Sequence, residues 1–204
     1  MSVSAAPAAS DRSDFRTVVV GGAKIGGLTA AAVVLYLALW RLVPPGLVQQ
    51  SLGALVVLAA GAGTGLLPGH WTSARRAEGI AGAAAMGLSG SVVFMAIDII
   101  LLRPFKAYPW TWDAIGGGST WWYLPIWWML GTFLAWMGAL LTACMAARGE
   151  ASPARVALPV LLGAVVLMIA ANVTRFHIVL PVGAGGGFTV SLAVLALVAL
   201  ARRP

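Results

Sequence analysis

The chain has 204 residues, of which 60% are hydrophobic and only 9% charged, and its formal net charge is +7. A soluble domain has about 25% charged residues, so 13 basic and 6 acidic side chains are too few to give a fold of this size a polar surface. Its Lys and Arg residues stand singly or in pairs at the ends of apolar segments, where they meet lipid head groups. The composition therefore excludes a soluble domain and argues against nucleic acid as a partner.

The apolar segments are long, continuous and rich in Ala, Leu and Gly. A membrane-spanning chain must satisfy its backbone hydrogen bonds internally, as helices or as a closed barrel. Barrel strands alternate apolar and polar residues, and these segments do not. The sequence predicts an all-α, polytopic membrane helix bundle of about six transmembrane helices. It divides into a disordered polar tail at residues 1–16 and a transmembrane domain at residues 17–204.

The spans are expected at residues 25–43, 47–67, 80–102, 120–147, 156–173 and 178–201. The first can begin as early as Thr17, with Lys24 reaching to the interface. Pro68 and Gly69 are expected to end the second span. In the last segment, Pro181 and glycines at 183 and 185–187 leave only residues 188–201 as uninterrupted helix, which is short for a crossing. This span is therefore expected to be broken or preceded by a re-entrant segment.

Orientation follows from the basic residues on each side of a six-span chain. One side holds nine: Arg12, Arg16, Lys24, Arg75, Arg76, Arg148, Arg155, Arg202 and Arg203. The other side holds Arg41, Arg103, Lys106 and Arg175, which completes the thirteen. Because cytoplasmic loops carry the basic excess, both termini are predicted to be cytoplasmic, in a cell (inner or plasma) membrane. The Ala-, Gly- and Arg-rich composition is typical of bacterial membrane proteins.

Seven of the nine tryptophans lie between residues 110 and 136. Indoles favour the head-group region, and such a belt accounts for the four at 110, 112, 121 and 122. It accounts less well for Trp127 and Trp128, which lie deeper, and for Trp136 near mid-membrane. Trp121, Trp128 and Trp136 are therefore candidates for a face that packs on other helices, a partner subunit, or a planar apolar ligand such as a quinone, carotenoid or lipid. We expect Trp128 and Trp136 to be buried against protein or ligand.

Asp98 is the only acidic residue within a predicted span, about one turn from the outer end. Intramembrane carboxylates are costly and mark function by default. The alternative is a shallow residue that reaches the interface or pairs with Arg103 or Lys106. Arg175 and His177, at the outer end of the fifth span, could join Asp98 in a shallow anion or head-group site. Equally, Arg175 is explained as a helix-end anchor.

Haem b needs axial histidines within spans, whereas His70 and His177 are predicted in loops on opposite sides, so haem is not expected. The single cysteine, Cys144, forms no metal site, and no zinc, nucleotide or nucleophile motif occurs in a believable context. No catalytic or metal-binding residue is assigned. Pairs of small residues, Gly22 with Gly26, Gly61 with Gly65 and Ala83 with Gly87, favour close helix contacts.

These features favour a non-enzymatic accessory subunit that packs against other subunits of a larger membrane complex. The alternative is a small transporter or lipophilic-ligand-binding protein with a site on the extracytoplasmic side. An enzyme is the least favoured of the three functions, because the sequence lacks the clusters of carboxylates or histidines that catalysis would need.

Overall fold

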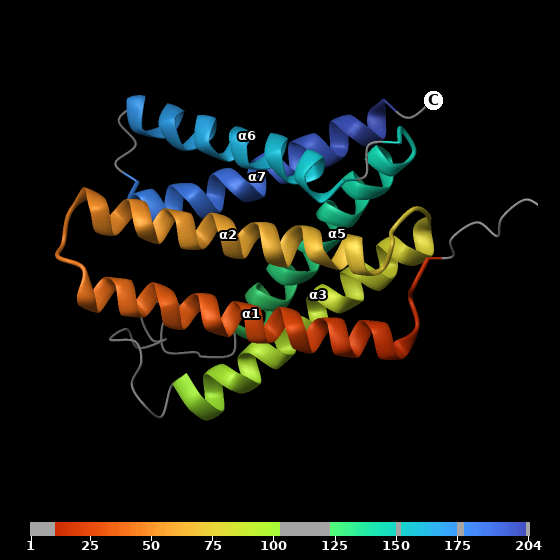
Figure 1. Cartoon of the computed structure of the whole chain (residues 1–204), viewed down its shortest axis with the longest axis horizontal. Helices are drawn as coiled ribbons and strands as arrows, with labels where there is room; N and C mark the ends of the chain where they lie inside the picture. Colours follow the sequence, from red (N-terminus) through yellow and green to blue (C-terminus); the bar gives the residue numbers. More distant parts are fainter. Residues whose placement is uncertain (1–10, 103–122, 150–151, 175–177, 203–204) are drawn as a thin grey trace, which may run out of the picture.

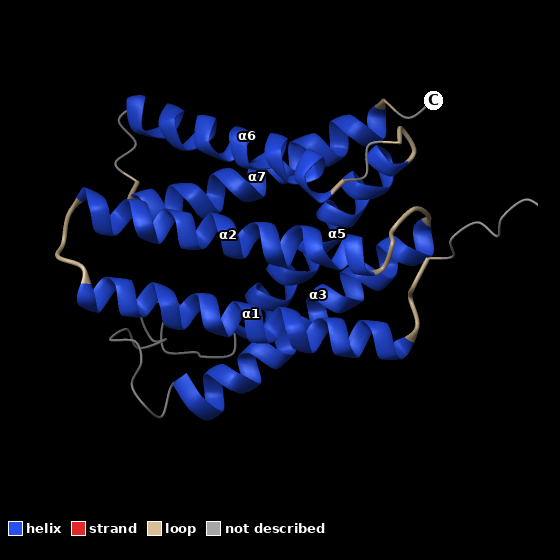
Figure 2. Ribbon diagram, in the orientation of Figure 1, coloured by secondary structure: helices blue, strands red, loops and turns tan. Residues whose placement is uncertain are grey.

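The computed structural model describes residues 11–102, 123–149, 152–174 and 178–202. Within these ranges all regular structure is helical (Figure 2). The helices are α1 (Phe15–Leu42), α2 (Leu47–Trp71), α3 (Ala77–Ile97), the π-helical turn η1 (Asp98–Leu102), α5 (Tyr123–Ala146), α6 (Pro153–Val173) and α7 (Leu180–Ala201). With η1 continuing α3, six helices are long and apolar enough to cross a bilayer. The predicted fold class is confirmed, and the chain is a multi-pass α-helical membrane protein.

The start of α1 and the end of α7 lie at the same end of the bundle, as an even number of crossings requires (Figure 1). The α2–α3 connection lies at this end too, whereas the turn between α1 and α2 lies at the opposite end. In this view α1, α2, α6 and α7 run roughly side by side, and α3 and α5 cross them obliquely. We call the end that holds the described termini the terminal end, and the other the distal end.

Glycines set the distance between crossing helices. A Cβ on Gly26 of α1 would lie 2.8 Å from the carbonyl oxygen of Gly90 on α3. A Cβ on Gly138 of α5 would overlap the carbonyl group of Gly65 on α2, so the two backbones touch. Such close approach replaces the hydrophobic effect as the source of helix association in lipid. The small-residue pairs found in the sequence are therefore used within the chain.

The largest core lies between α2, α5, α6 and α7, where Phe188 and Leu192 of α7 are 2% and 0% exposed. Phe188 fits against Gly61 and Gly65 of α2, whose added Cβ atoms would lie 3.0 and 3.4 Å from its ring. Two hydroxyls add polar links between helices. Ser191 donates to the Val160 carbonyl (2.9 Å), and Ser91 donates to the Trp127 carbonyl (3.2 Å). These bonds join α7 to α6 and α3 to α5.

The expectation of a broken sixth span is wrong, because α7 is one continuous helix from Leu180 to Ala201. Pro181 lies in the first turn, where its missing N–H would have had no intrahelical partner. Glycine weakens a helix in water chiefly through lost entropy, but here Gly187 lets α7 approach the backbone of α6 closely. A Cβ at this position would lie 2.7 Å from the Ala164 carbonyl oxygen. Close packing thus compensates for the poor helix propensity.

The predicted end of the second span at Leu67 is also wrong, since α2 continues through Pro68 and Gly69 to Trp71. Pro68 removes one backbone hydrogen bond in the last turn. Its own carbonyl accepts from both the backbone N–H (3.0 Å) and the hydroxyl (2.9 Å) of Thr72. Gly69 packs directly on α5, because a Cβ added at this position would lie only 2.7 Å from the Cα of Ala139. Packing against α5 therefore stabilises the last turn of α2, although the local sequence favours the end of the helix.

Candidate functional site

Asp98 is fully buried, with none of its surface exposed. It begins the π-helical turn η1, three residues after the buried Met95 of α3. The Phe94 ring lies 5.9 Å from the ring of Trp127 on α5, so this segment packs between helices. Asp98 has at least one polar or electrostatic partner in the protein. Its burial argues against a residue that merely reaches the lipid interface.

Trp128 and Trp136 of α5 are 38% and 48% exposed, so the rest of the described chain does not bury them. Met129, which shares a helical stripe with Trp136 seven residues later, is 71% exposed. The neighbouring faces of α5 are occupied: Gly131 and Ala135 meet Gly87 of α3, and Leu134 and Met137 enter the large core. Within the described residues nothing covers Trp128 and Trp136, so lipid, a ligand or another chain are candidates for their cover, and their predicted burial stays a prediction. We call Trp128, Met129 and Trp136 the α5 aromatic face.

The other candidate residues, Arg103, Trp121, Arg175 and His177, lie outside the described residues, as do Trp110 and Trp112. The grouping of Asp98 with Arg175 and His177 thus stays a prediction. In the part of the chain that is described, no group of three or more His, Cys, Asp or Glu side chains could hold a metal ion. Cys144 is buried in the large core beside α6 and α7.

Sequence reasoning missed a polar clasp at the terminal end. Asp11, within the predicted tail, accepts hydrogen bonds from the backbone N–H groups of Arg75 (3.2 Å), Arg76 (2.8 Å) and Gly79 (2.9 Å). It thereby caps the N-terminus of α3, whose own cap residue, Arg76, makes no side-chain capping bond. The Arg12 N–H donates to the Thr72 carbonyl (2.8 Å). The absence of a Ser, Thr, Asp or Asn cap before Ala77 is the one signal that could have pointed to a distant cap.

Asp14 caps α1 in the ordinary way, accepting from the N–H (3.0 Å) and hydroxyl (2.7 Å) of Thr17. The bond from the Thr17 hydroxyl, together with that from its N–H, holds the pKa of Asp14 below its usual 3.8. A lowered folded-state pKa means that this cap stabilises the fold above the unfolded value and is lost as the pH falls through the lowered one. Residues 11–16, the described part of the predicted tail at residues 1–16, are thus joined to α1 and to the α2–α3 connection.

Replacing Asp11 by alanine should lower the free energy of unfolding by about 1 kcal/mol, as loss of a helix cap does elsewhere. Three backbone donors lose their common acceptor. The measurement is thermal unfolding of the purified protein in mild detergent. Asp11→Asn keeps one side-chain oxygen and should lose less. If Asp11→Ala melts at the wild-type temperature, the clasp has no energetic role.

Comparison of this chain with protein-family models, curated proteins and solved structures gives no match.

Proposed function

We propose that this chain is a non-enzymatic accessory subunit of a larger membrane complex, with the α5 aromatic face as its contact with a partner subunit. The observation that carries the proposal is the half-exposed indole of Trp136 in the middle of a span. Trp136 lies thirteen residues after Tyr123 and ten before Ala146, about 15–20 Å from either end of α5. An aromatic belt at the interface does not extend to this depth.

The chemistry of the indole favours protein over lipid as its cover. Its N–H group needs a hydrogen-bond acceptor, and hydrocarbon tails have none. A neighbouring helix can offer a hydroxyl or carbonyl together with a large apolar contact. Trp136 and Trp128 are also too bulky for the glycine-type contact used inside the bundle. They would insert as anchors between helices of the partner, as aromatic hot spots do at other interfaces.

Site-specific photo-crosslinking in native membranes tests the proposal. A photoreactive amino acid at position 136 should give one discrete protein adduct, which mass spectrometry can identify. The matched control is position 166, because Val166 is 63% exposed and near the middle of α6. It should label lipid only. Lipid labelling alone from both positions would overturn the accessory-subunit proposal.

A second candidate function, favoured by the complete burial of Asp98, is a small transporter or lipophilic-ligand binder with its site toward the extracytoplasmic side. A quinone, carotenoid or lipid would suit the aromatic residues of α5. Purification in mild detergent separates the two functions. A stoichiometric protein partner supports the accessory subunit, whereas a bound small molecule without a protein partner supports the binder.

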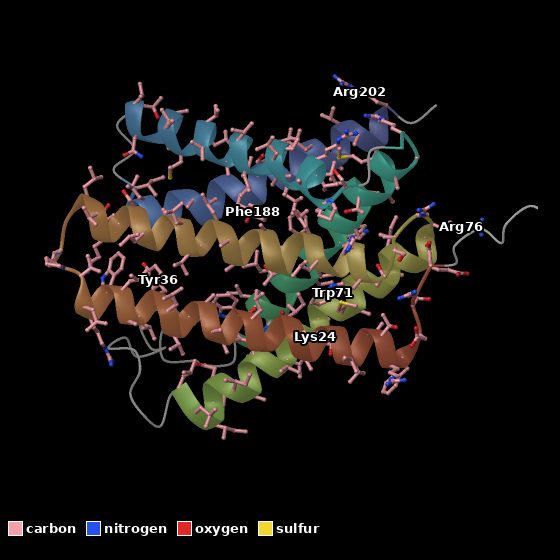
Figure 3. The ribbon with its side chains drawn as sticks, in the orientation of Figure 1. Lys24, Tyr36, Trp71, Arg76, Phe188 and Arg202 are labelled. Carbon is pink, nitrogen blue, oxygen red and sulfur yellow. The ribbon has the colours of Figure 1, made fainter. Side chains whose placement is uncertain are left out.

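We further propose that the terminal end faces the cytoplasm of a bacterial inner membrane. Exposed arginines cluster there on helix ends and connections, including Arg76 and Arg202 (Figure 3). Reporter fusions after Arg76, Arg148 and Arg203 should read cytoplasmic, and a fusion after Asp113 should read outside. Asp113 and Arg148 on the same side would contradict this topology.

A further inference from the structure

An apolar groove of about 390 Å³ runs along the surface of the bundle between α1 and α2. Leu28, Ala31 and Leu35 line it on α1, and Leu55, Val56 and Ala59 line it on α2. The α1 residues recur at helical spacing, so they form one continuous stripe. Because α1 and α2 are membrane-spanning helices, the groove opens to the hydrocarbon of the bilayer.

Two aromatic rings lie beyond the groove toward the distal end. Tyr36 and Trp40 of α1 stack with ring centroids 5.0 Å apart. Both rings lie over Gly53 of α2, where an added Cβ would be 3.1 Å from each. Tyr36 accordingly appears between the ribbons of α1 and α2 in Figure 3. At Gly53, the side chains of Tyr36 and Trp40 thus fill the space between α1 and α2.

A cation lies one turn beyond the other end of the groove. Lys24, one turn before Leu28 on α1, places its Nζ 5.6 Å from the ring centroid of Trp71, the last residue of α2. The two labelled residues lie close together in Figure 3. Lys24 is exposed, so its ammonium can bind a further group while it contacts the indole. Since α2 ends here, the ammonium lies where the chain leaves the membrane, at head-group depth.

The groove is shorter than one lipid leaflet. The residues that line it on α1 run from Leu28 to Leu35, a rise of about 10 Å along the helix. Half of a typical hydrocarbon core is about 15 Å. An acyl chain whose head group lies at the ammonium, one turn before Leu28, can therefore follow the groove within a single leaflet. A polar ligand would not match the apolar lining.

We propose that this groove holds one acyl chain of an anionic phospholipid whose phosphate is bound by Lys24. The ammonium supplies the charge-assisted hydrogen bond that an anionic head group accepts. Trp71 fixes the direction of the long lysine side chain and so reduces the entropy lost on binding. The lipid would come from the leaflet at the terminal end of the bundle. This site is separate from the α5 aromatic face and stands whether or not a partner subunit exists.

The test uses the purified, delipidated full chain and measures retention of added lipid by native mass spectrometry. Wild-type protein should retain phosphatidylglycerol in preference to phosphatidylcholine. Lys24→Gln should weaken phosphatidylglycerol binding by about tenfold, the order expected for losing one charge-assisted contact, and remove the preference. Arg155→Gln, which removes another exposed cation at the terminal end, is the control and should bind as wild type does.

Filling the groove tests the position of the acyl chain. Ala31→Phe and Ala59→Phe place a ring in the groove from α1 and from α2, and both alanines are exposed, so the bundle should still fold. Each should reduce retention of phosphatidylglycerol. Wild-type binding by Lys24→Gln, or by both groove-filling variants, would overturn the proposal.

Discussion

Replacing Gly138 by alanine should destabilise the protein by about 3 kcal/mol or more, at the upper end of the cost of overpacking a core. The added methyl group would overlap the carbonyl oxygen of Gly65 and lie 2.7 Å from its carbon. Backbone atoms in a helix cannot rotate away as a flexible side chain can. Helices α2 and α5 would have to separate, and contacts along the whole crossing would weaken. Gly138→Leu should prevent folding.

The matched control is Gly186→Ala on α7. Apart from the backbone of its own helix and its chain neighbours, no described atom lies within 4 Å of an added Cβ at Gly186, so only helix propensity changes. This substitution should be neutral or stabilise the helix by up to about 1 kcal/mol. Reversible unfolding in mixed detergent micelles measures both variants. If Gly138→Ala and Gly186→Ala unfold alike, the close crossing of α2 and α5 does not exist in the folded protein.

Replacing Asp98 by alanine should cost about 3 kcal/mol, the order of removing one partner from a buried polar or charged pair. Asp98 is fully buried and has a polar or electrostatic partner in the protein, so its removal deletes that interaction and leaves a gap in a buried position. Asp98→Asn keeps the size of the side chain and a hydrogen-bonding oxygen, so it should fold. It would lose binding or transport if the carboxylate is used in function.

The control for Asp98 is Ile100→Ala in the same π-helical turn, because Ile100 is 67% exposed. It should unfold close to the wild type. Stability is measured by the same micelle unfolding, and function by the amount of small molecule that co-purifies. Wild-type stability and wild-type ligand content in both Asp98 variants would remove the main support for the transporter or ligand-binder candidate.

The number and position of the spans could be predicted from the sequence, because a bilayer imposes a minimum length of apolar helix. Most predicted spans share at least one end with an observed helix. The fifth span, predicted at residues 156–173, corresponds to α6 (Pro153–Val173). The importance of Gly22, Gly26, Gly61 and Gly65 could also be read from their spacing. Their partners could not, since a small residue indicates that a backbone can approach but not which one.

Helix ends and side-chain directions were decided by tertiary structure. Pro68 of α2 and Gly187 of α7 are unfavourable in a helix by local propensity, yet close contact of α2 with α5 and of α7 with α6 keeps both helices continuous. Asp11 belongs to a segment with the composition of a disordered tail. Its carboxylate nevertheless accepts hydrogen bonds from the backbone N–H groups of Arg76 and Gly79, which are distant in sequence. The helical periodicity of α5 places its tryptophans on neighbouring faces, but it does not show which face packs against other helices. Propensity and periodicity are local, whereas burial depends on which helices meet.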